Sequence, residues 1–97
     1  MKRSYELVTI HRPDLRDEEV AEERNRIVSA IVERGGEVTK VDPWGKRRLA
    51  YEINKFREGI YTVFEFTAPP KAVYELEHVI RLNESIIRHL IVRTDED

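Results

Sequence analysis

The sequence predicts a single α+β domain of four strands and two helices, in the order strand, helix, strand, strand, helix, strand. Three observations support this fold class. Two segments repeat apolar side chains at helical spacing, four segments alternate or concentrate them at strand spacing, and Gly, Pro or Asn residues separate the segments. A length of 97 residues suits one core. We therefore expect residues 1–97 to form one domain.

The first strand and the first helix are expected over residues 4–10 and 17–34. The strand alternates between two sets of side chains, which are Tyr5, Leu7 and Thr9 on one face and Glu6, Val8 and Ile10 on the other. In the helix, Asp17 can cap the N-terminus, and the glutamates that follow suit the positive end of the helix dipole. Its apolar stripe consists of Val20, Ile27, Val28, Ile31 and Val32. Gly35 and Gly36 end it.

The remaining elements follow in the second half of the chain. A long strand over residues 37–53 contains Pro43, Trp44 and Gly45, which predict a bulge or bend. A polar turn over 54–59 leads to a third strand over 60–67. The second helix, over 71–82, has a buried face made of Ala72, Val73, Leu76, Val79 and Ile80. A turn over 83–85 precedes the last strand, over 86–93, and an acidic end over 94–97.

Two strand–helix–strand units joined by a hairpin give the ferredoxin-like arrangement, a four-stranded antiparallel sheet with both helices on one face. The uncovered face of such a sheet is expected to be polar. Here it carries apolar side chains instead, among them Val8 or Tyr5 on the first strand and Tyr61 and Val63 on the third. An uncovered apolar face indicates a protein partner, although apolar residues on both faces are also typical of central strands.

Composition and motifs argue against an enzyme. The chain has no cysteine, which fits a reducing cytosol, and neither a membrane-length apolar run nor a signal peptide. Three histidines, in a loop, a helix and a strand, lack metal-ligand spacing; they are His11, His78 and His89. No serine lies in a nucleophile motif, and Gly35-Gly36 reads as a helix stop. We expect no catalysis, metal, cofactor, small-molecule substrate or membrane contact.

The positive charge is clustered, although the formal net charge is −2 and the sequence pI is about 5.9. The clustered cations are Lys2, Arg3, Lys46, Arg47, Arg48, Lys55, Arg57, Arg88 and Arg93. Cations at strand ends can meet phosphates, and they can equally protect a sheet edge from aggregation. The aromatic pattern of an RNA recognition motif is missing, so base stacking on the sheet is not expected.

The facing of the basic triplet, residues 46–48, follows from strand alternation. Lys46 and Arg48 share one face, and Arg47 shares the other with Leu49, Tyr51 and Ile53. Because that second set is the larger apolar one, we expect it to pack toward the helices. Lys46 and Arg48 would then project to the uncovered side or rim, unless the bend at residues 43–45 rotates the register.

Several motifs resemble the family of bacterial small-subunit ribosomal protein number six, over nearly the whole chain. The most specific is an aromatic-Gly-basic-Arg-x-Leu-Ala-Tyr-x-Ile run, which matches residues 44–53. Tyr5-Glu6 matches the start of the family, and the later matches are Lys55, Gly59, Tyr61, Asn83, Ile87 and Arg88. A departure is Glu52, where many relatives have proline.

The resemblance implies a ferredoxin-like fold without catalysis, in a structural component of the small ribosomal subunit in the cytoplasm. It further implies binding to the central domain of small-subunit ribosomal RNA, as a heterodimer with small-subunit ribosomal protein number eighteen. The expected RNA-binding residues are Lys2, Arg3, Lys46, Arg47, Arg48, Arg88 and Arg93. The expected partner-binding residues are Trp44, Val8, Ile10 and Tyr61.

Two alternatives share the same fold. A small ligand-sensing or homo-oligomerising domain would bury the apolar sheet face in a homodimer. An acylphosphatase-like enzyme would need a glycine-rich anion loop with a placed arginine after the first strand, where His11-Arg12-Pro13 stands instead.

Overall fold

The protein has four strands and two helices in the expected order, in a computed structural model that describes residues 1–95. Their bounds are β1 (Arg3–His11), α1 (Asp17–Glu33), β2 (Glu37–Ile53), β3 (Phe56–Ala68), α2 (Pro70–Arg81) and β4 (Ile86–Arg93). The bounds of β2 and β4 agree with the predicted ones. Residues 96–97 of the predicted acidic end lie outside the described residues.

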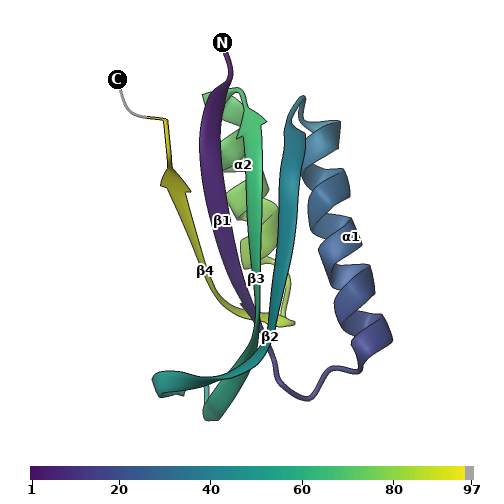
Figure 1. The fold of residues 1–97 in the computed structure, drawn as a ribbon, viewed down its shortest axis with the longest axis vertical. Coiled ribbons are helices and arrows are strands. Elements are labelled where there is room, and N and C mark those ends of the chain that lie inside the picture. The colour runs from purple at the N-terminus through teal and green to yellow at the C-terminus, as the bar shows by residue number, and fades with distance from the viewer. Residues whose placement is uncertain (96–97) are drawn as a thin grey trace.

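The four strands form one antiparallel sheet in the order β2-β3-β1-β4, with β1 and β3 at its centre. Both helices lie on the same side of this sheet, and the other side carries no helix (Figure 1). This is the ferredoxin-like arrangement, so the predicted fold class is confirmed. The sheet therefore has a covered face, toward α1 and α2, and an open face.

The core fills the space between the covered face and the helices. Leu7 and Phe64 lie opposite each other on β1 and β3 and are fully buried. Ile31 of α1 and Leu76 of α2 belong to the same apolar cluster. Burial of each such side chain is worth about 1.5–3 kcal/mol. The alternation of β1 thus directs Tyr5, Leu7 and Thr9 to the covered face.

The start of α1 differs from the prediction. Arg16, rather than Asp17, occupies the N-cap position, and its backbone N–H donates a 2.8 Å hydrogen bond to Oε1 of Glu19. This bond lowers the pKa of Glu19 below its ordinary value. Asp17 instead is the first residue of the helix, where its charge still favours the positive end of the dipole. The predicted stop is confirmed, because α1 ends at Glu33, just before Gly35-Gly36.

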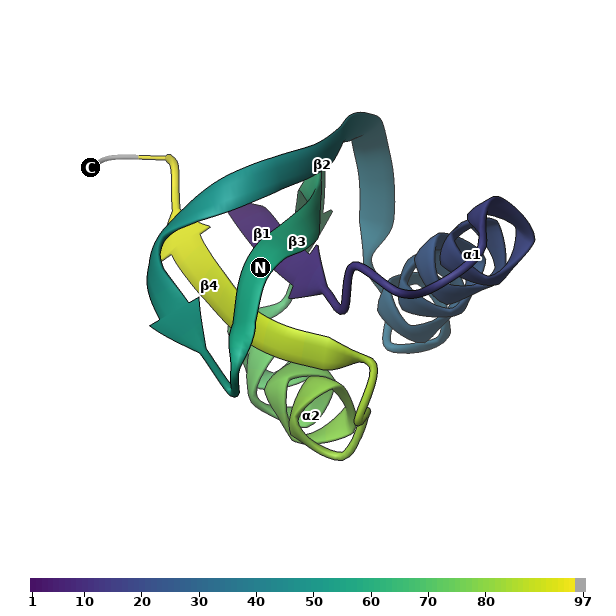
Figure 2. The same ribbon diagram turned by 90° about the horizontal axis from the view of Figure 1, so that it is seen from below.

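The apolar stripes of the helices are narrower than predicted. Val32 and Val79 are exposed, whereas Ala30 and Glu23 are buried. The two helices lie apart in the view from below (Figure 2), and Val79 lines a groove between them. The buried carboxylate of Glu23 is compensated by groups from other elements.

The pairing of β2 with β3 is irregular at three points, of which the first lies between Val38 and Lys40. The second is the predicted irregularity between Pro43 and Gly45, where Gly45 has a φ of +83° that favours glycine. At the third, Arg48 pairs with Glu58 and Ile53 with Phe56, so four residues of β2, 49–52, lie opposite Arg57 alone. The longer strand must bow, and the β2–β3 hairpin curls at its tip (Figure 2).

The connection between β2 and β3 is shorter than the predicted turn over residues 54–59. Only Asn54 and Lys55 lie outside the strands, and both have positive φ, of 49° and 70°. This is the geometry of a two-residue hairpin turn, which matches the twist of its strands. Because Phe56 pairs with Ile53, β3 begins four residues earlier than predicted.

Candidate nucleic-acid and partner interface

The open face of the sheet carries an apolar surface, as the sequence predicted. Val8 on β1 lies opposite Val63 on β3 and Leu90 on β4, and Val92 follows Leu90 on the same face. Leu90 is 59% exposed and Val92 44% exposed. No element of the described chain covers these side chains, since both helices lie on the other side.

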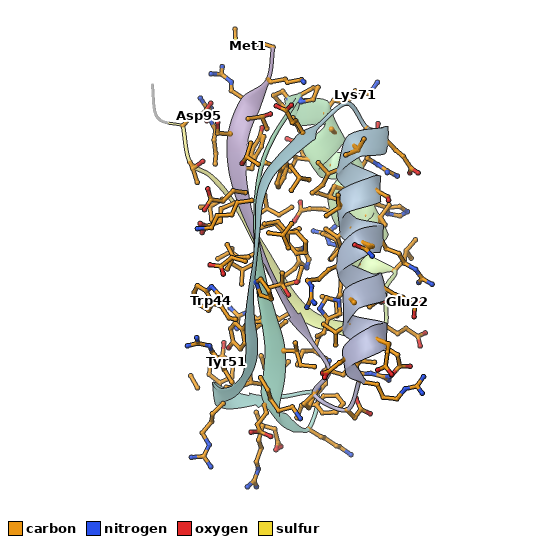
Figure 3. All side chains as sticks on the ribbon, turned by 45° about the vertical axis from the view of Figure 1, so that its right-hand side comes forward. Met1, Glu22, Trp44, Tyr51, Lys71 and Asp95 are labelled. Atoms are coloured by element: carbon orange, nitrogen blue, oxygen red, sulfur yellow. The ribbon has the colours of Figure 1, made fainter. Side chains whose placement is uncertain are left out.

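An aromatic stack lies on the same face, beside this aliphatic surface. The rings of Trp44 and Tyr61 are nearly parallel, at 13°, with their centroids 6.3 Å apart. The guanidinium carbon of Arg47 lies 5.0 Å from the centroid of the Trp44 ring. The indole N–H of Trp44 donates a 3.0 Å hydrogen bond to Asp42. Figure 3 shows Trp44 and Tyr51 on the side of the sheet away from α1.

The curled tip of the β2–β3 hairpin folds over the open face. Leu49 is buried there, and Ile10 and Leu49 both approach the backbone of Gly59. A Cβ atom on Gly59 would lie 2.2 Å from Cγ2 of Ile10, so this close approach requires glycine. Further along, Arg88 of β4 donates a hydrogen bond to the hydroxyl of Tyr51, and its guanidinium carbon lies 5.9 Å from the Tyr51 ring centroid.

The predicted facing of the basic triplet is therefore wrong. Lys46 pairs with Ile60, whose side chain belongs to the covered face, and Lys46 lines a small cavity with residues of α1. Arg47 faces the open side, over Trp44. Leu49 and Tyr51 lie with Arg47 on the open side rather than toward the helices. Strand alternation is kept over this stretch, but the larger apolar set does not pack against the helices as expected, because the curled hairpin gives it a place on the open face.

The predicted RNA-binding residues do not form one patch. Strand register places Arg88 opposite Ile10, close to the curled hairpin that carries Lys46, Arg47 and Arg48. Arg93 instead pairs with Tyr5 at the start of β1, next to Lys2 and Arg3. Arg93 also bonds to Asp95 at 2.9 Å, which lowers the pKa of Asp95. The cations thus occupy the two opposite ends of the sheet.

Of the predicted partner-binding residues, three retain surface on the open face. Val8 and Tyr61 are half-buried, and Trp44 is exposed. Ile10 is buried near Leu49 and Gly59, so its side chain supports the curled hairpin rather than offering a surface.

A buried polar cluster on the covered side was not predicted from the sequence. His11 is the last residue of β1, not a loop residue, and it is fully buried. Its Nε2 atom lies 3.4 Å from Oε1 of Glu23, and Asn83 Nδ2 donates a 2.6 Å hydrogen bond to the same oxygen. Burial lowers the pKa of His11, an effect that the carboxylate of Glu23 partly opposes. The only sequence signal was a glutamate at a position of α1 that faces the core.

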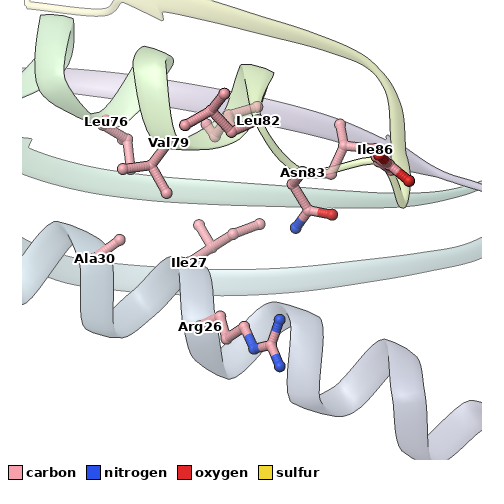
Figure 4. Close-up of a pocket in the computed structure, with 10 residues that line it drawn as sticks. Arg26, Ile27, Ala30, Leu76, Val79, Leu82, Asn83 and Ile86 are labelled. Carbon is pink, nitrogen blue, oxygen red and sulfur yellow. The ribbon is translucent and has the colours of Figure 1, made fainter.

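A groove of about 380 Å³ runs between α1 and α2 near this cluster (Figure 4). Its walls are mainly apolar, with Ile27 and Ala30 from α1 and Leu76 and Val79 from α2. Asn83 at its end is already bonded to Glu23. The groove therefore brings together no acid–base pair or nucleophile from the described residues.

Two other kinds of site were also sought within residues 1–95. No group of three or more histidine, cysteine or acidic side chains there is arranged to hold a metal ion. In the same range, no helix has the length and apolar character needed to cross a membrane.

Comparison with known proteins gives one consistent result. A family model described as "Ribosomal protein S6" matches residues 4–93. A small ribosomal subunit protein bS6 from Desulforamulus reducens is 48% identical over 94 residues, which cover 97% of this chain and 99% of that protein. The bS6 protein of Moorella thermoacetica is 43% identical over 98% of this chain and 97% of its own length.

A solved structure agrees in both sequence and fold. The crystal structure of 30S ribosomal protein S6 from Thermotoga maritima has a TM-score of 0.93 and 38% identity, covering 97% of this chain and 89% of that one. The family consists of ribosomal proteins and is not an enzyme family. The chain therefore belongs to the ribosomal protein S6 family, the family that its sequence motifs resemble.

Proposed function

We propose that this chain binds the central domain of small-subunit ribosomal RNA together with small-subunit ribosomal protein number eighteen. The observation that carries the proposal is the open sheet face, with the exposed side chains of Leu90, Val92 and Trp44. Contiguous exposed apolar surface on a small soluble domain indicates a protein partner. The S6 family is a family of small ribosomal subunit proteins, so the partner is sought on the cytoplasmic ribosome.

The charge of the chain supports shared rather than independent RNA binding. Proteins that bind nucleic acid alone through phosphates are usually basic, whereas this chain has a net charge of −2. Its cations are divided between the two ends of the sheet. A basic partner on the apolar surface between those ends would complete a continuous cationic surface.

We assign the residues of the open face accordingly. Val8, Trp44 and Tyr61 contact the partner, and Ile10 holds the curled hairpin beneath them. The cations of the hairpin end and of the opposite end contact phosphates; they are Lys46, Arg47, Arg48, Arg88, Lys2, Arg3 and Arg93. The function needs no metal, cofactor, small-molecule substrate or membrane.

A binding assay on fragments of central-domain ribosomal RNA, with and without the partner protein, tests the proposal. We expect weak binding by the chain alone and strong binding once the partner is added, both at physiological salt. Nanomolar binding by the chain alone, unchanged by the partner, would show that the composite surface does not exist.

The main competing function is a homodimer through the same open face. The mass of the isolated protein in solution separates the two, because the proposal requires a face that is free for a different protein. A stable homodimer that persists when the partner is added would contradict the proposed heterodimer.

A further inference from the structure

The open face has two parts with different chemistry. Where Val8 lies opposite Val63 and Leu90, the exposed side chains are aliphatic. One step further along β1, Ile10 lies opposite Tyr61 and Arg88, and there the surface is aromatic and cationic. Tyr61 borders both parts, so it is available to a protein partner, whereas Tyr51 and Arg88 in the second part are features that an apolar protein surface does not use.

The second part contains a cleft of about 150 Å³, formed where the curled hairpin stands over the sheet. Its walls come from three strands and include Leu49, Tyr51 and Ile53 of β2, Tyr61 of β3 and Arg88 of β4. Apolar side chains, two tyrosines and a guanidinium thus line the same small cleft.

Tyr51 is held in place although it is 61% exposed. The hydrogen bond from Arg88 fixes its hydroxyl, and the guanidinium lies over its ring. An exposed aromatic ring that is fixed before binding loses little conformational entropy when a flat ligand stacks on it. The cation on that ring also lies close to any group that enters the cleft.

The charge around the cleft is positive, in contrast to the whole chain. The lining of the cleft includes the guanidinium of Arg88 and, among the described residues, no carboxylate, and Arg47 lies on the same open face. A ligand for this cleft must therefore combine an apolar surface with an anionic group. A nucleotide satisfies both requirements, because its base is flat and its phosphate is anionic.

We propose that this cleft binds one unpaired nucleotide of RNA, with its base against Tyr51 and its phosphate on Arg88. The proposal rests on the RNA-binding function above and adds to it the kind of RNA element that this end of the sheet recognises. Bases in an A-form helix are already stacked on their neighbours, so only a bulged or looped base can enter.

The test compares variants of Tyr51 in complex with the partner and a central-domain RNA fragment. Tyr51→Phe keeps the ring and is the matched control, while Tyr51→Leu keeps an apolar side chain but removes the ring. We expect Tyr51→Leu to weaken RNA binding about ten-fold, within the range for loss of one stacked base, and Tyr51→Phe to change it much less. Reactivity of the RNA 2′-hydroxyls should show one unpaired nucleotide that the wild type and Tyr51→Phe constrain and Tyr51→Leu leaves mobile.

Each other outcome has a definite meaning. If Tyr51→Leu binds RNA as tightly as the wild type and constrains the same nucleotides, the nucleotide site is wrong and the proposed function stands. If Tyr51→Leu weakens binding of the partner in the absence of RNA, the cleft belongs to the protein interface and the nucleotide site is again wrong. If the wild type does not bind the RNA fragment even with the partner, both proposals fail.

Discussion

Asn83 Nδ2 lies 2.6 Å from Oε1 of Glu23, although the two residues are 60 positions apart in the chain. The same carboxylate lies 3.4 Å from His11. Glu23 thus joins α1, the end of β1 and the turn before β4 in a place where apolar packing between the helices is incomplete.

Glu23→Ala should destabilise the protein by about 1–3 kcal/mol, because it leaves the Asn83 amide and the buried His11 ring without their partner. Glu22→Ala, at the exposed neighbouring position, is the control and should change stability by less than about 0.5 kcal/mol. Urea unfolding measures both. Equal effects of the two changes would show that the buried cluster contributes nothing to stability.

His11 should make stability depend on pH. Because burial lowers the pKa of His11 in the folded state below its ordinary value of 6.5, the unfolded chain takes up a proton first as the pH falls. The stability that neutral His11 contributes is therefore present above pH 6.5 and is lost as the pH falls through the lower folded value. Unfolding free energies of the wild type and His11→Gln, measured about one unit above and below that pH, should differ in slope.

The control for this pH dependence is His78→Gln, which removes an exposed histidine of α2 and leaves the buried cluster intact. Protonation of Glu19 and Asp95 also reduces stability, but only at more acidic pH. The pKa values of these two carboxyl groups are lowered from ordinary values of 4.5 and 3.8. A His11→Gln variant with the wild-type slope would contradict the assignment.

Gly59→Ala should destabilise the protein by about 1–3 kcal/mol, since the new methyl group would overlap Cγ2 of Ile10. The same change should loosen the curled hairpin, because Leu49 lies over the same point. Amide hydrogen exchange in residues 49–53 should then speed up more than exchange at the far end of β2. Glu58→Ala, at the adjacent exposed position, should leave both quantities nearly unchanged.

Arg47→Ala should weaken the complex with RNA and partner and reduce the slope of its salt dependence by about one unit, as for one lost phosphate contact. Stability should change by about 0.5 kcal/mol, as is usual for an exposed position. Lys71→Ala, a cation of α2 away from the open face, is the control for charge alone. If the two changes had the same effect on the salt slope, the position of Arg47 over Trp44 would have no part in binding.

Leu90→Lys should prevent binding of the partner while the fold remains intact, because this leucine is the most exposed side chain of the aliphatic surface. Light scattering or calorimetry with the partner measures the loss, and circular dichroism checks the fold. Tyr74→Lys, at an exposed apolar position on α2, is the matched control. Undiminished binding by Leu90→Lys would place the partner elsewhere on the chain.

The sequence was sufficient for the order of elements and for the apolar open face, because both follow from local periodicity. Gly35-Gly36 correctly predicted the end of α1, and Pro43–Gly45 correctly predicted the bulge in β2. Helix ends and bulges depend on the conformational preferences of a few residues. The facing of Lys46 and Arg47 could not be predicted in this way. The prediction directed the larger apolar set, with Leu49 and Tyr51, toward the helices. The curl of the hairpin instead places that set on the open face, and the curl depends on strand pairing, which is a property of the folded sheet.

Contacts between distant segments were equally inaccessible to sequence reasoning. The hydrogen bond from Arg88 to Tyr51 exists because four residues of β2 bow over one residue of β3. The role of Glu23 depends on where His11 and Asn83 come to lie. Helical spacing puts Glu23 on the same stripe as Val20 and Ile27, but nothing in the local pattern shows which distant groups meet its carboxylate.

The position of β1 at the centre of the sheet determines when the sheet can form during synthesis of the chain. The first strand to be made pairs with β3 and β4, and its nearest partner along the chain, Ile60, follows His11 by 49 residues. The newly made β1 therefore remains unpaired until β3 has been made, whereas β2 and β3 can form a hairpin from residues close together in the chain. The sheet closes only when Arg93 reaches Tyr5, so the last strand to be made completes the pairing of the first.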